Sequence, residues 1–392
     1  MSNKSLLSSP FGDYSIALNS DNSYSDANPL KGFNAADEYL LNHLSEIDFS
    51  KYPKTLIVND KFGALTLSLA SKTEITCYGD SINSFNAIKN NAYLNNVDVS
   101  AVKFLPVNEK LYTKFDLVII KMPNSFDLLE FQLQQIYSHV KTRNLIIAAE
   151  MVKYVTSPLL QKFESNIGKV TTSKAVKKAR LIFSELNTEL ELPTKKLVKE
   201  FVVSDLNIKI QEEKLLPLNL VNYPGTFSSG KLDQGSRLLL ENLRLTEKDK
   251  IIYDLGCGNG VLGIVAAKVQ PKANLYFFDE SYLAIESAKE SWEKNQLANK
   301  VYYYTASQIN ETIPKADVIL CNPPYHIGNT RSNEIALLMF EQAKNQLNPG
   351  GRLIVVSNHH LNYITQLKKH FSRVKEKEKN SKYHIIIATQ ES

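Results

Sequence analysis

The 392-residue sequence is short of several features that would assign it to a particular class of protein. It has three cysteines, at positions 77, 257 and 321, and they stand singly. No disulfide framework or CxxC zinc motif is therefore predicted, and a reducing compartment is favoured. No apolar run approaches the roughly 20 residues of a membrane span, and the first residues lack the apolar core of a signal peptide. We expect a cytoplasmic protein with no membrane partner and no structural metal.

A large excess of one charge is also absent, because the net charge is +5 and the isoelectric point is near 8.7. The total alone does not predict a nucleic-acid-binding protein. The basic residues are unevenly distributed, however, with eight basic against three acidic residues between Lys169 and Lys199. This segment predicts a phosphate-binding face. Its candidate contact residues are Lys174, Lys177, Lys178 and Arg180.

The C-terminal half alternates short β-rich runs with helical patterns, which is typical of a parallel sheet covered by helices on both faces. The pattern predicts an α/β, doubly wound, Rossmann-like domain. Its predicted strands are 251–254, 275–279, 301–305, 318–321, 353–357 and 384–389, and its predicted helices are 261–269, 282–295, 333–347 and 360–370. A further helix is predicted at 238–243.

The same order of elements recurs in the first half, which indicates an internal duplication. Asp80 and Asp279 lie 199 residues apart at equivalent positions, and Lys121 and Asn322 lie 201 apart. The first copy has Lys121-Met122-Pro123-Asn124 where the second has an Asn-Pro-Pro-Tyr run, and it lacks a multi-glycine loop. We expect two tandem domains, the first degenerate.

The predicted boundaries divide the chain into three parts. Residues 1–194 form the degenerate domain, residues 195–230 form a β-hairpin linker and capping segment, and residues 231–392 form the domain that keeps a site. The alternation of apolar residues over 201–210 predicts the hairpin. Residues 1 to about 30, rich in Ser and Asn, are expected to be loosely ordered.

A glycine loop follows the first strand of the second copy, in the run Asp254-Leu255-Gly256-Cys257-Gly258-Asn259-Gly260. Its three glycines allow a sharp turn and a close approach of the backbone to a ligand. Asp279 stands 19 residues beyond the last glycine, at the end of the next strand. A carboxylate at this position can accept hydrogen bonds from ribose hydroxyls, so a nucleoside ligand is predicted.

Both NAD and S-adenosylmethionine are compatible with this plan. Asp254 favours the second, because a carboxylate beside the loop repels a pyrophosphate but attracts a sulfonium and an α-amino group. Alternatively, Asp254 simply ends a strand at the surface. The segment before the domain can cover the cofactor or can be an ordinary loop with a helix cap. The other predicted cofactor-binding residues are Cys257, Ala306, Ser307, Phe227 and Ser236.

The run Asn322-Pro323-Pro324-Tyr325 (NPPY) follows the fourth strand of the second copy. It is either an ordinary strand-ending turn or a site for a planar amine. The Asn322 side-chain oxygen and the Pro323 carbonyl can accept the two amine protons, the prolines stiffen the turn, and Tyr325 offers a stacking face. Because ligands bind at the carboxyl ends of strands in such sheets, this turn and the glycine loop predict an amino methyltransferase.

The chain resembles the bacterial ribosomal RNA guanine-N2 methyltransferases that carry tandem class I methyltransferase domains, the first degenerate. The likeness covers nearly the full length. It is carried by the segments 28–30, 35–41, 177–181, 227–237, 254–260 and 322–326. Residues 28–30 with 35–41, and residues 177–181, are more similar to the large-subunit (23S) enzymes than to the small-subunit (16S) enzymes.

The resemblance implies S-adenosylmethionine as methyl donor, a guanine amine as acceptor and free or partly assembled 23S ribosomal RNA as partner, bound mostly by the first domain. With RNA as the partner, the predicted phosphate-binding residues Lys174, Lys177, Lys178 and Arg180 are expected to contact it. Three alternatives remain: a 16S RNA enzyme, a protein-glutamine or DNA-adenine methyltransferase, and a non-catalytic ribosome assembly factor.

Two further clusters are assigned no chemistry. The basic residues between Lys368 and Lys379 either add phosphate contacts or form a solvated charged face, and the second is favoured. His326, His359 and His360 are not expected to bind metal, because adjacent histidines on one element point apart and no third ligand is evident.

Overall fold

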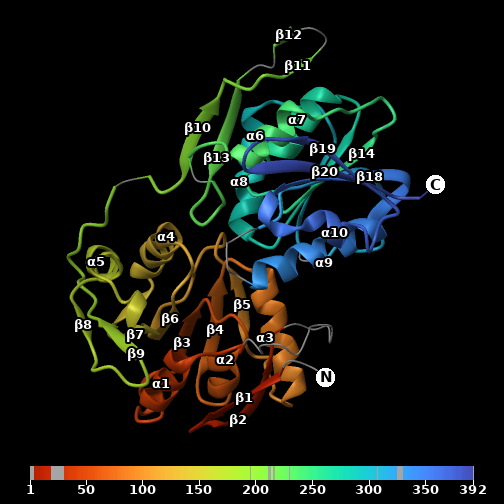
Figure 1. Cartoon of the computed structure of the whole chain (residues 1–392). Coiled ribbons are helices and arrows are strands. Elements are labelled where there is room, and N and C mark those ends of the chain that lie inside the picture. Colours follow the sequence, from red (N-terminus) through yellow and green to blue (C-terminus); the bar gives the residue numbers. More distant parts are fainter. Residues whose placement is uncertain are drawn as a thin grey trace. The chain divides into compact units, whose positions relative to one another are not determined.

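The computed structural model divides into two compact units, Met1–Leu197 and Val198–Ser392 (Figure 1). The structure describes residues 4–18, 31–194, 196–210, 213–214, 217–228, 230–306, 308–324 and 330–391. Among these residues, no helix is both long and apolar enough to cross a membrane.

The second unit contains a seven-stranded sheet, two small hairpins and five α-helices within its described residues. The strands of the sheet are β14 (Ile251–Leu255), β15 (Asn274–Asp279), β16 (Val301–Thr305), β17 (Ala316–Cys321), β18 (Leu347–Asn358), β19 (Arg373–Lys379) and β20 (Tyr383–Thr389). The helices are α6 (Gln234–Glu241), α7 (Val261–Val269), α8 (Tyr282–Lys294), α9 (Thr330–Gln346) and α10 (Tyr363–Leu367). The hairpin strands are β10 (Lys199–Val203), β11 (Lys209–Ile210), β12 (Glu213–Lys214) and β13 (Leu218–Asn222).

The strand order of this sheet is β16-β15-β14-β17-β18-β20-β19, with the first five strands parallel. In the pairing of β14 with β17, Leu255 lies opposite Cys321. The next residues along the chain are Gly256 and Asn322, so the two loops begin side by side at the carboxyl ends of these strands. The strand order changes direction at β14, and ligands of doubly wound folds bind at such a switch point.

Alternate strand residues face two separate apolar cores, as a sheet buried on both faces requires. One core packs Ile252, Phe277 and Leu320 against α6, α7 and α8. The other packs Tyr253, Phe278 and their neighbours against α9 and α10. The doubly wound prediction is confirmed for this unit.

The first unit repeats the architecture, with the strand order β5-β4-β3-β6-β7-β9-β8. Each position in this order corresponds to a position in the second sheet, so the predicted tandem arrangement is present. The sheet strands are β3 (Lys54–Val58), β4 (Glu74–Gly79), β5 (Lys103–Pro106), β6 (Phe115–Lys121), β7 (Val140–Met151), β8 (Val170–Thr172) and β9 (Ala179–Ser184). The helices are α1 (Ala35–Leu44), α2 (Ala64–Leu69), α3 (Ile82–Leu94), α4 (Phe126–Tyr137) and α5 (Ser157–Asn166), and a hairpin of β1 (Lys4–Ser9) and β2 (Gly12–Ala17) precedes them.

One pair of hydrogen bonds recurs at the same place in both units. At the end of α3, the Asn95 side chain accepts from the Ser15 backbone N–H and donates to the Ser15 carbonyl, at 2.7 and 2.9 Å. At the end of α8, Asn295 makes the same two bonds to Asn219, at 3.3 and 2.7 Å. In each unit a helix-ending asparagine holds the hairpin strand that precedes the sheet.

Several sequence predictions are corrected by these elements. Residues 4–17 form a paired hairpin, whereas loose order was expected there. β10 pairs with β13 and not with the stretch after residue 205, and Val203, Leu206 and Leu218 belong to the core of the second unit. The charged segment Arg373–Lys379 forms an edge strand, β19, that was not predicted, although its side chains are mostly exposed, as expected of a solvated face. Helix α6 begins at Gln234 rather than at 238.

The first unit buries an ion pair at the end of β6, where the second unit has Asn322. The Lys121 ammonium lies 2.6 Å from a carboxylate oxygen of Asp37 and 3.9 Å from one of Asp60, and all three side chains are 15% exposed or less. Burial lowers the pKa of Lys121, but the two carboxylates together outweigh burial and the pKa is raised. A fixed internal cation therefore occupies this strand end in the degenerate unit.

We predict that Lys121→Met destabilises the first unit by about 3–5 kcal/mol, because it leaves two carboxylates buried without their cation. Urea unfolding curves measure the change. Lys51→Met is the matched control, since Lys51 faces Asp48 at 3.7 Å with 73% of its side chain exposed. Its loss should cost less than about 1 kcal/mol. Similar unfolding midpoints for the two variants would contradict the prediction.

Candidate active site

The glycines of the loop between β14 and α7 have different roles. Gly260 is the N-cap of α7 with a φ of 79°, and a Cβ atom there would lie 3.0 Å from Ala288 Cβ and 3.1 Å from Phe277. It permits close packing of α7 on the rest of the unit. Gly258 has a φ of 54° and a Cβ there would meet nothing within 4 Å. Gly258 therefore leaves open space beside the loop, where a ligand can approach the backbone.

Asp279 holds this loop from the end of β15. One carboxylate oxygen accepts from the Gly258 N–H at 2.9 Å, and the other accepts from the Ser281 N–H at 3.0 Å. Burial raises the pKa of Asp279 to about 6, with a smaller contribution from Glu280. Each oxygen keeps a further lone pair, so the side chain can still accept a hydroxyl hydrogen bond.

Asp254 is 1% exposed and therefore does not end its strand at the surface. One oxygen accepts from the Gly263 N–H at 2.8 Å, but the other is buried without a hydrogen-bond partner in the described structure. Burial raises the pKa of Asp254 to about 8. A buried acceptor left unpaired is costly, and a positive group placed against it would compensate.

The segment before α6 is tied to the glycine loop through asparagine side chains. Asn259 donates to the Asn222 side chain at 2.9 Å, and Asn222 donates to the Phe227 carbonyl at 3.1 Å. The Phe227 ring is 57% exposed. Cys257, in contrast, packs its side chain into the core beneath the loop, so only its backbone is available to a ligand.

The side-chain amide of Asn322 is held by the start of α6. Its nitrogen donates to a carboxylate oxygen of Asp233 at 3.0 Å and to the Ser236 hydroxyl at 2.9 Å. Pro323 is buried and Pro324 is exposed. The predicted site residues Tyr325 and Ser307 lie outside the described residues, as does His326.

Asp233 and Asn222 are functional candidates that the sequence did not single out. Asp233 was visible only as a residue before a helix, and its contact with Asn322 spans 89 positions. Ser236 was predicted to touch the cofactor, and the structure places its hydroxyl on Asn322. The one available signal was the N-cap pattern, since Asp is a preferred N-cap residue.

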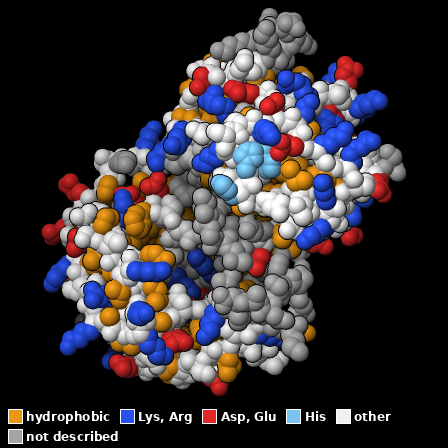
Figure 2. Space-filling model, in the orientation of Figure 1, with side chains coloured by type: hydrophobic (Ala, Val, Ile, Leu, Met, Phe, Trp, Pro, Cys, Tyr) orange, Lys and Arg blue, Asp and Glu red, His pale blue; other side chains and the backbone are white. Residues whose placement is uncertain are grey.

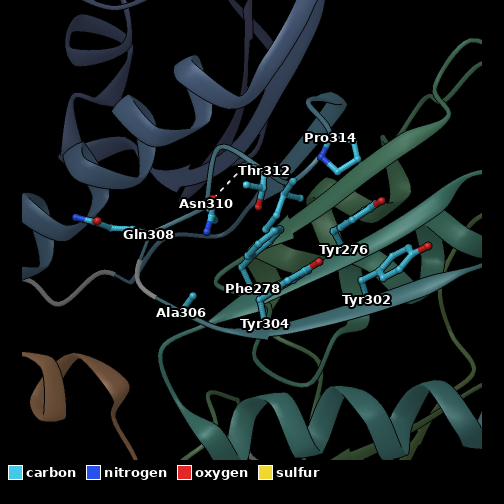
Figure 3. A pocket seen from close by; sticks show the side chains of 10 residues that line it. Tyr276, Phe278, Tyr302, Tyr304, Ala306, Gln308, Asn310, Thr312 and Pro314 are labelled. Atoms are coloured by element: carbon cyan, nitrogen blue, oxygen red, sulfur yellow. Dashed lines mark hydrogen bonds between the residues drawn. The ribbon is translucent and has the colours of Figure 1, made fainter.

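A cavity of about 450 Å³ lies on the α9 side of β15 and β16 (Figure 3). Tyrosine rings of the two strands line it, with Tyr276 and Tyr302 stacked at 4.6 Å between ring centroids. Ala306, a predicted cofactor residue, lies at the opposite end from Pro314. Because neither the glycine loop nor Asn322 lines this cavity, it borders the predicted site without containing the reacting groups.

A histidine cluster on the second unit differs from expectation. Figure 2 shows histidine side chains grouped on the visible face, and ligand-type atoms of His359, Glu376 and His384 lie within 4.8 Å of one another. The expectation that His359 has no further ligand group nearby was wrong. Both His384 nitrogens are hydrogen-bonded, to Glu376 and to Ser357 at 2.9 Å each.

The predicted basic contacts lie around the turn between β8 and β9. Val176 and Ala179 exchange backbone hydrogen bonds of 2.9 and 2.8 Å across this turn, and Lys177 and Lys178 at its centre have φ values of 47° and 62°. Lys174 is exposed with them, whereas Arg180 is half-buried on β9. Positive φ at both central positions favours Asn-Gly, so two lysines here are strained.

Known proteins match both halves of the chain. Residues 217–387 match the methyltransferase small domain, and residues 9–188 match the RLMG N-terminal domain. The ribosomal RNA large subunit methyltransferase G of Pseudomonas paraeruginosa is 35% identical over 98% of this chain and 99% of its own length. The protein of the same name from Ectopseudomonas mendocina is 36% identical over 92% and 94%.

A solved structure shares the whole architecture. The T. thermophilus 16S rRNA N2 methyltransferase RsmC, in complex with AdoMet and guanosine, covers 99% of this chain and 98% of its own, with a TM-score of 0.76 at 19% identity. At this identity the likeness shows the fold.

Two doubly wound units, of which the second keeps the glycine loop and the matching domain, make this chain a class I methyltransferase with tandem domains. The enzyme class predicted from the sequence is thereby confirmed. Because curated relatives match over nearly the whole length, the chain belongs to the ribosomal RNA large subunit methyltransferase G family.

The raised pKa of Asp254 predicts a pH-dependent stability. Between its ordinary pKa of 3.8 and its folded value of about 8, only the unfolded state ionises, so stability is lost as pH rises. We expect a loss of about 1.4 kcal/mol per pH unit between about pH 6 and 8, a window above the pKa of Asp279. Urea unfolding of the wild type and of Asp254→Asn measures it. A variant with an equally steep slope would refute this origin.

Proposed function

We propose that this chain transfers a methyl group from S-adenosylmethionine to the exocyclic N2 amine of a guanine in 23S ribosomal RNA. The observation that carries the proposal is the Asn322 amide, whose nitrogen is bound by Asp233 and Ser236 at the strand end beside the glycine loop. The names of the relatives support the large-subunit RNA, and the guanosine bound to RsmC supports the acceptor.

The residues around the glycine loop fit the proposed cofactor. The unpaired oxygen of Asp254 suits its positive charge, Gly258 leaves room for a close approach, and Asp279 can accept from the ribose. Bound S-adenosylmethionine would supply an electrophilic methyl group. Ala306 and Ser307 would flank the adenine, Phe227 would cover it, and the backbone of Cys257 would line the site.

The chemistry needed from the protein is to free the guanine lone pair. An amine conjugated to a ring is a poor nucleophile, because its lone pair is delocalised. The Asn322 side-chain oxygen and the Pro323 carbonyl would accept the two amine hydrogens and orient the nitrogen toward the methyl group. Pro324 would stiffen the turn, and Tyr325 would stack on a base that has left its helix.

The first unit is proposed to bind RNA rather than cofactor. Its strand end carries the buried Lys121 cation with Asp37, where the second unit carries Asn322. The exposed turn at Lys177 and Lys178, with Lys174 and Arg180, supplies positive charge for phosphates. A unit that binds without reacting suits a large structured substrate, such as free or partly assembled ribosomal RNA in the cytoplasm.

The decisive experiment incubates the protein with tritiated S-adenosylmethionine and deproteinised 23S or 16S RNA, then identifies the labelled nucleoside. The expected product is N2-methylguanosine in 23S RNA. Label in 16S RNA would move the substrate to the small subunit, label in adenine or in protein would contradict the proposal, and no label would favour an RNA-binding assembly factor.

Asn322→Ala tests the role of the amide within this reaction. We expect kcat to fall by about a hundredfold or more, because an oriented acceptor is lost, while the affinity for S-adenosylmethionine stays close to wild type. Calorimetric titration of the cofactor is the control. A comparable loss of cofactor binding would show that Asn322 acts on the donor instead.

The strained lysine turn offers a test that separates RNA binding from folding. Lys177→Asn combined with Lys178→Gly should raise the free energy of unfolding by about 1–2 kcal/mol, because these residues tolerate positive φ. The same variant should bind RNA more weakly, with a salt slope lower by roughly 1.5.

A control with the same charge loss elsewhere is Lys72→Gln with Lys110→Gln, two exposed lysines of the first unit. Its unfolding free energy and its RNA affinity should both stay near wild type. Unchanged RNA affinity in the turn variant would refute the role of this turn.

A further inference from the structure

We infer that Asp233, assisted by Ser236, is a positioning residue that sets which way the Asn322 amide faces. The inference rests on the proposed amine-binding role of Asn322. It adds a residue that acts through Asn322 and controls the polarity of the group presented to the substrate.

The hydrogen bonds of Asn322 account for its whole donor capacity. A side-chain amide nitrogen has two hydrogens, and the two acceptors are Asp233 at 3.0 Å and Ser236 at 2.9 Å. No hydrogen bond of the Asn322 oxygen appears among the described residues. The amide therefore directs its nitrogen to the start of α6 and keeps its oxygen for another partner.

The carboxylate makes this orientation the only favourable one. An ionised carboxylate only accepts hydrogen bonds, so a flipped amide would place its oxygen against another oxygen at about the same distance. Ser236 cannot impose this alone, because a hydroxyl both donates and accepts. The orientation matters since an amide that presented its nitrogen would donate to the guanine amine and could not free its lone pair.

The backbone fixes the carboxylate itself. Asp233 is the N-cap of α6, and the oxygen that binds Asn322 also accepts from the Ser236 backbone N–H at 2.9 Å. Gly235 allows this close arrangement, since a Cβ atom there would lie 3.1 Å from that oxygen. The helix cap and the amide share one anion, which ties α6 to the end of β17.

In the first unit, the equivalent contact between helix start and strand end is an ion pair. Asp37 is the third residue of α1, as Ser236 is of α6, and it binds Lys121 at the matching strand end. The link from helix start to strand end is therefore present in both units. In the second unit the linked group is instead a neutral amide, whose oxygen has no hydrogen bond among the described residues.

The test is Asp233→Asn, which keeps the N-cap because Asn and Asp cap helices about equally well. The asparagine that caps the helix places a neutral oxygen where the carboxylate oxygen was, so the bond it accepts from Asn322 loses its charge assistance and holds the amide orientation more weakly. We expect kcat to fall roughly five- to tenfold, the difference between a hydrogen bond to a charged group and one to a neutral group. The KM for RNA and the affinity for S-adenosylmethionine should stay near wild type.

Two comparisons make the result specific. In an Asn322→Ala background, Asp233→Asn should cause no further loss of kcat, because it acts through the missing amide. Asp48→Asn is the matched control, since Asp48 is an N-cap in the first unit that also bonds a backbone N–H. Wild-type kcat in Asp233→Asn, or equal losses in both backgrounds, would overturn the inference.

A readout without turnover separates this inference from the proposed function. In protein labelled with nitrogen-15 at asparagine, the Asn322 amide resonance is the one missing from Asn322→Ala. Its hydrogens should exchange slowly in the wild type and several times faster in Asp233→Asn, where the bond to residue 233 is weaker. Fast exchange in both would refute the positioning role, whether or not the protein methylates guanine.

Discussion

The contact between the start of one helix and the end of the fourth strand is the constraint on which both units depend. In parallel sheets of this order, that strand end lies beside the loop after the first strand. In the first unit the group at this strand end is the Lys121 ammonium, buried against Asp37, and in the second it is the partly exposed Asn322 amide, bound to Asp233.

The two units differ in the charge that lies beside their buried carboxylate. In the first unit, Asp60 is 4% exposed, its second oxygen accepts from Thr66, and Lys121 provides the positive charge. In both units one buried carboxylate oxygen, of Asp60 or of Asp254, lacks a hydrogen-bond partner among the described residues. Within the described structure, only Asp60 has an internal cation nearby, so a bound cation would stabilise the second unit, where Asp254 has none beside it. The presence or absence of an internal cation beside this carboxylate therefore distinguishes the structural unit from the reactive unit.

Much of this architecture could be predicted from the sequence, because apolar runs mark buried parallel strands and glycines mark the loop. The strand β19 was missed, since Arg373–Lys379 alternates lysine and glutamate without an apolar face. Such charges are how an edge strand avoids pairing with another chain. The hydrogen bond between Asp233 and Asn322 could not be predicted from the sequence for a different reason. It joins two elements that only the strand order of the sheet brings together.

The paired asparagines at positions 95 and 295 have a consequence for how such a chain can change. They make the same bonds to the preceding hairpin in both units, although only one unit keeps the open strand end. A chain with two copies of one fold therefore carries its own internal comparison. Residues that are the same at equivalent positions of the two copies serve the fold. Residues that differ at equivalent positions mark where one copy has a reactive site and the other does not.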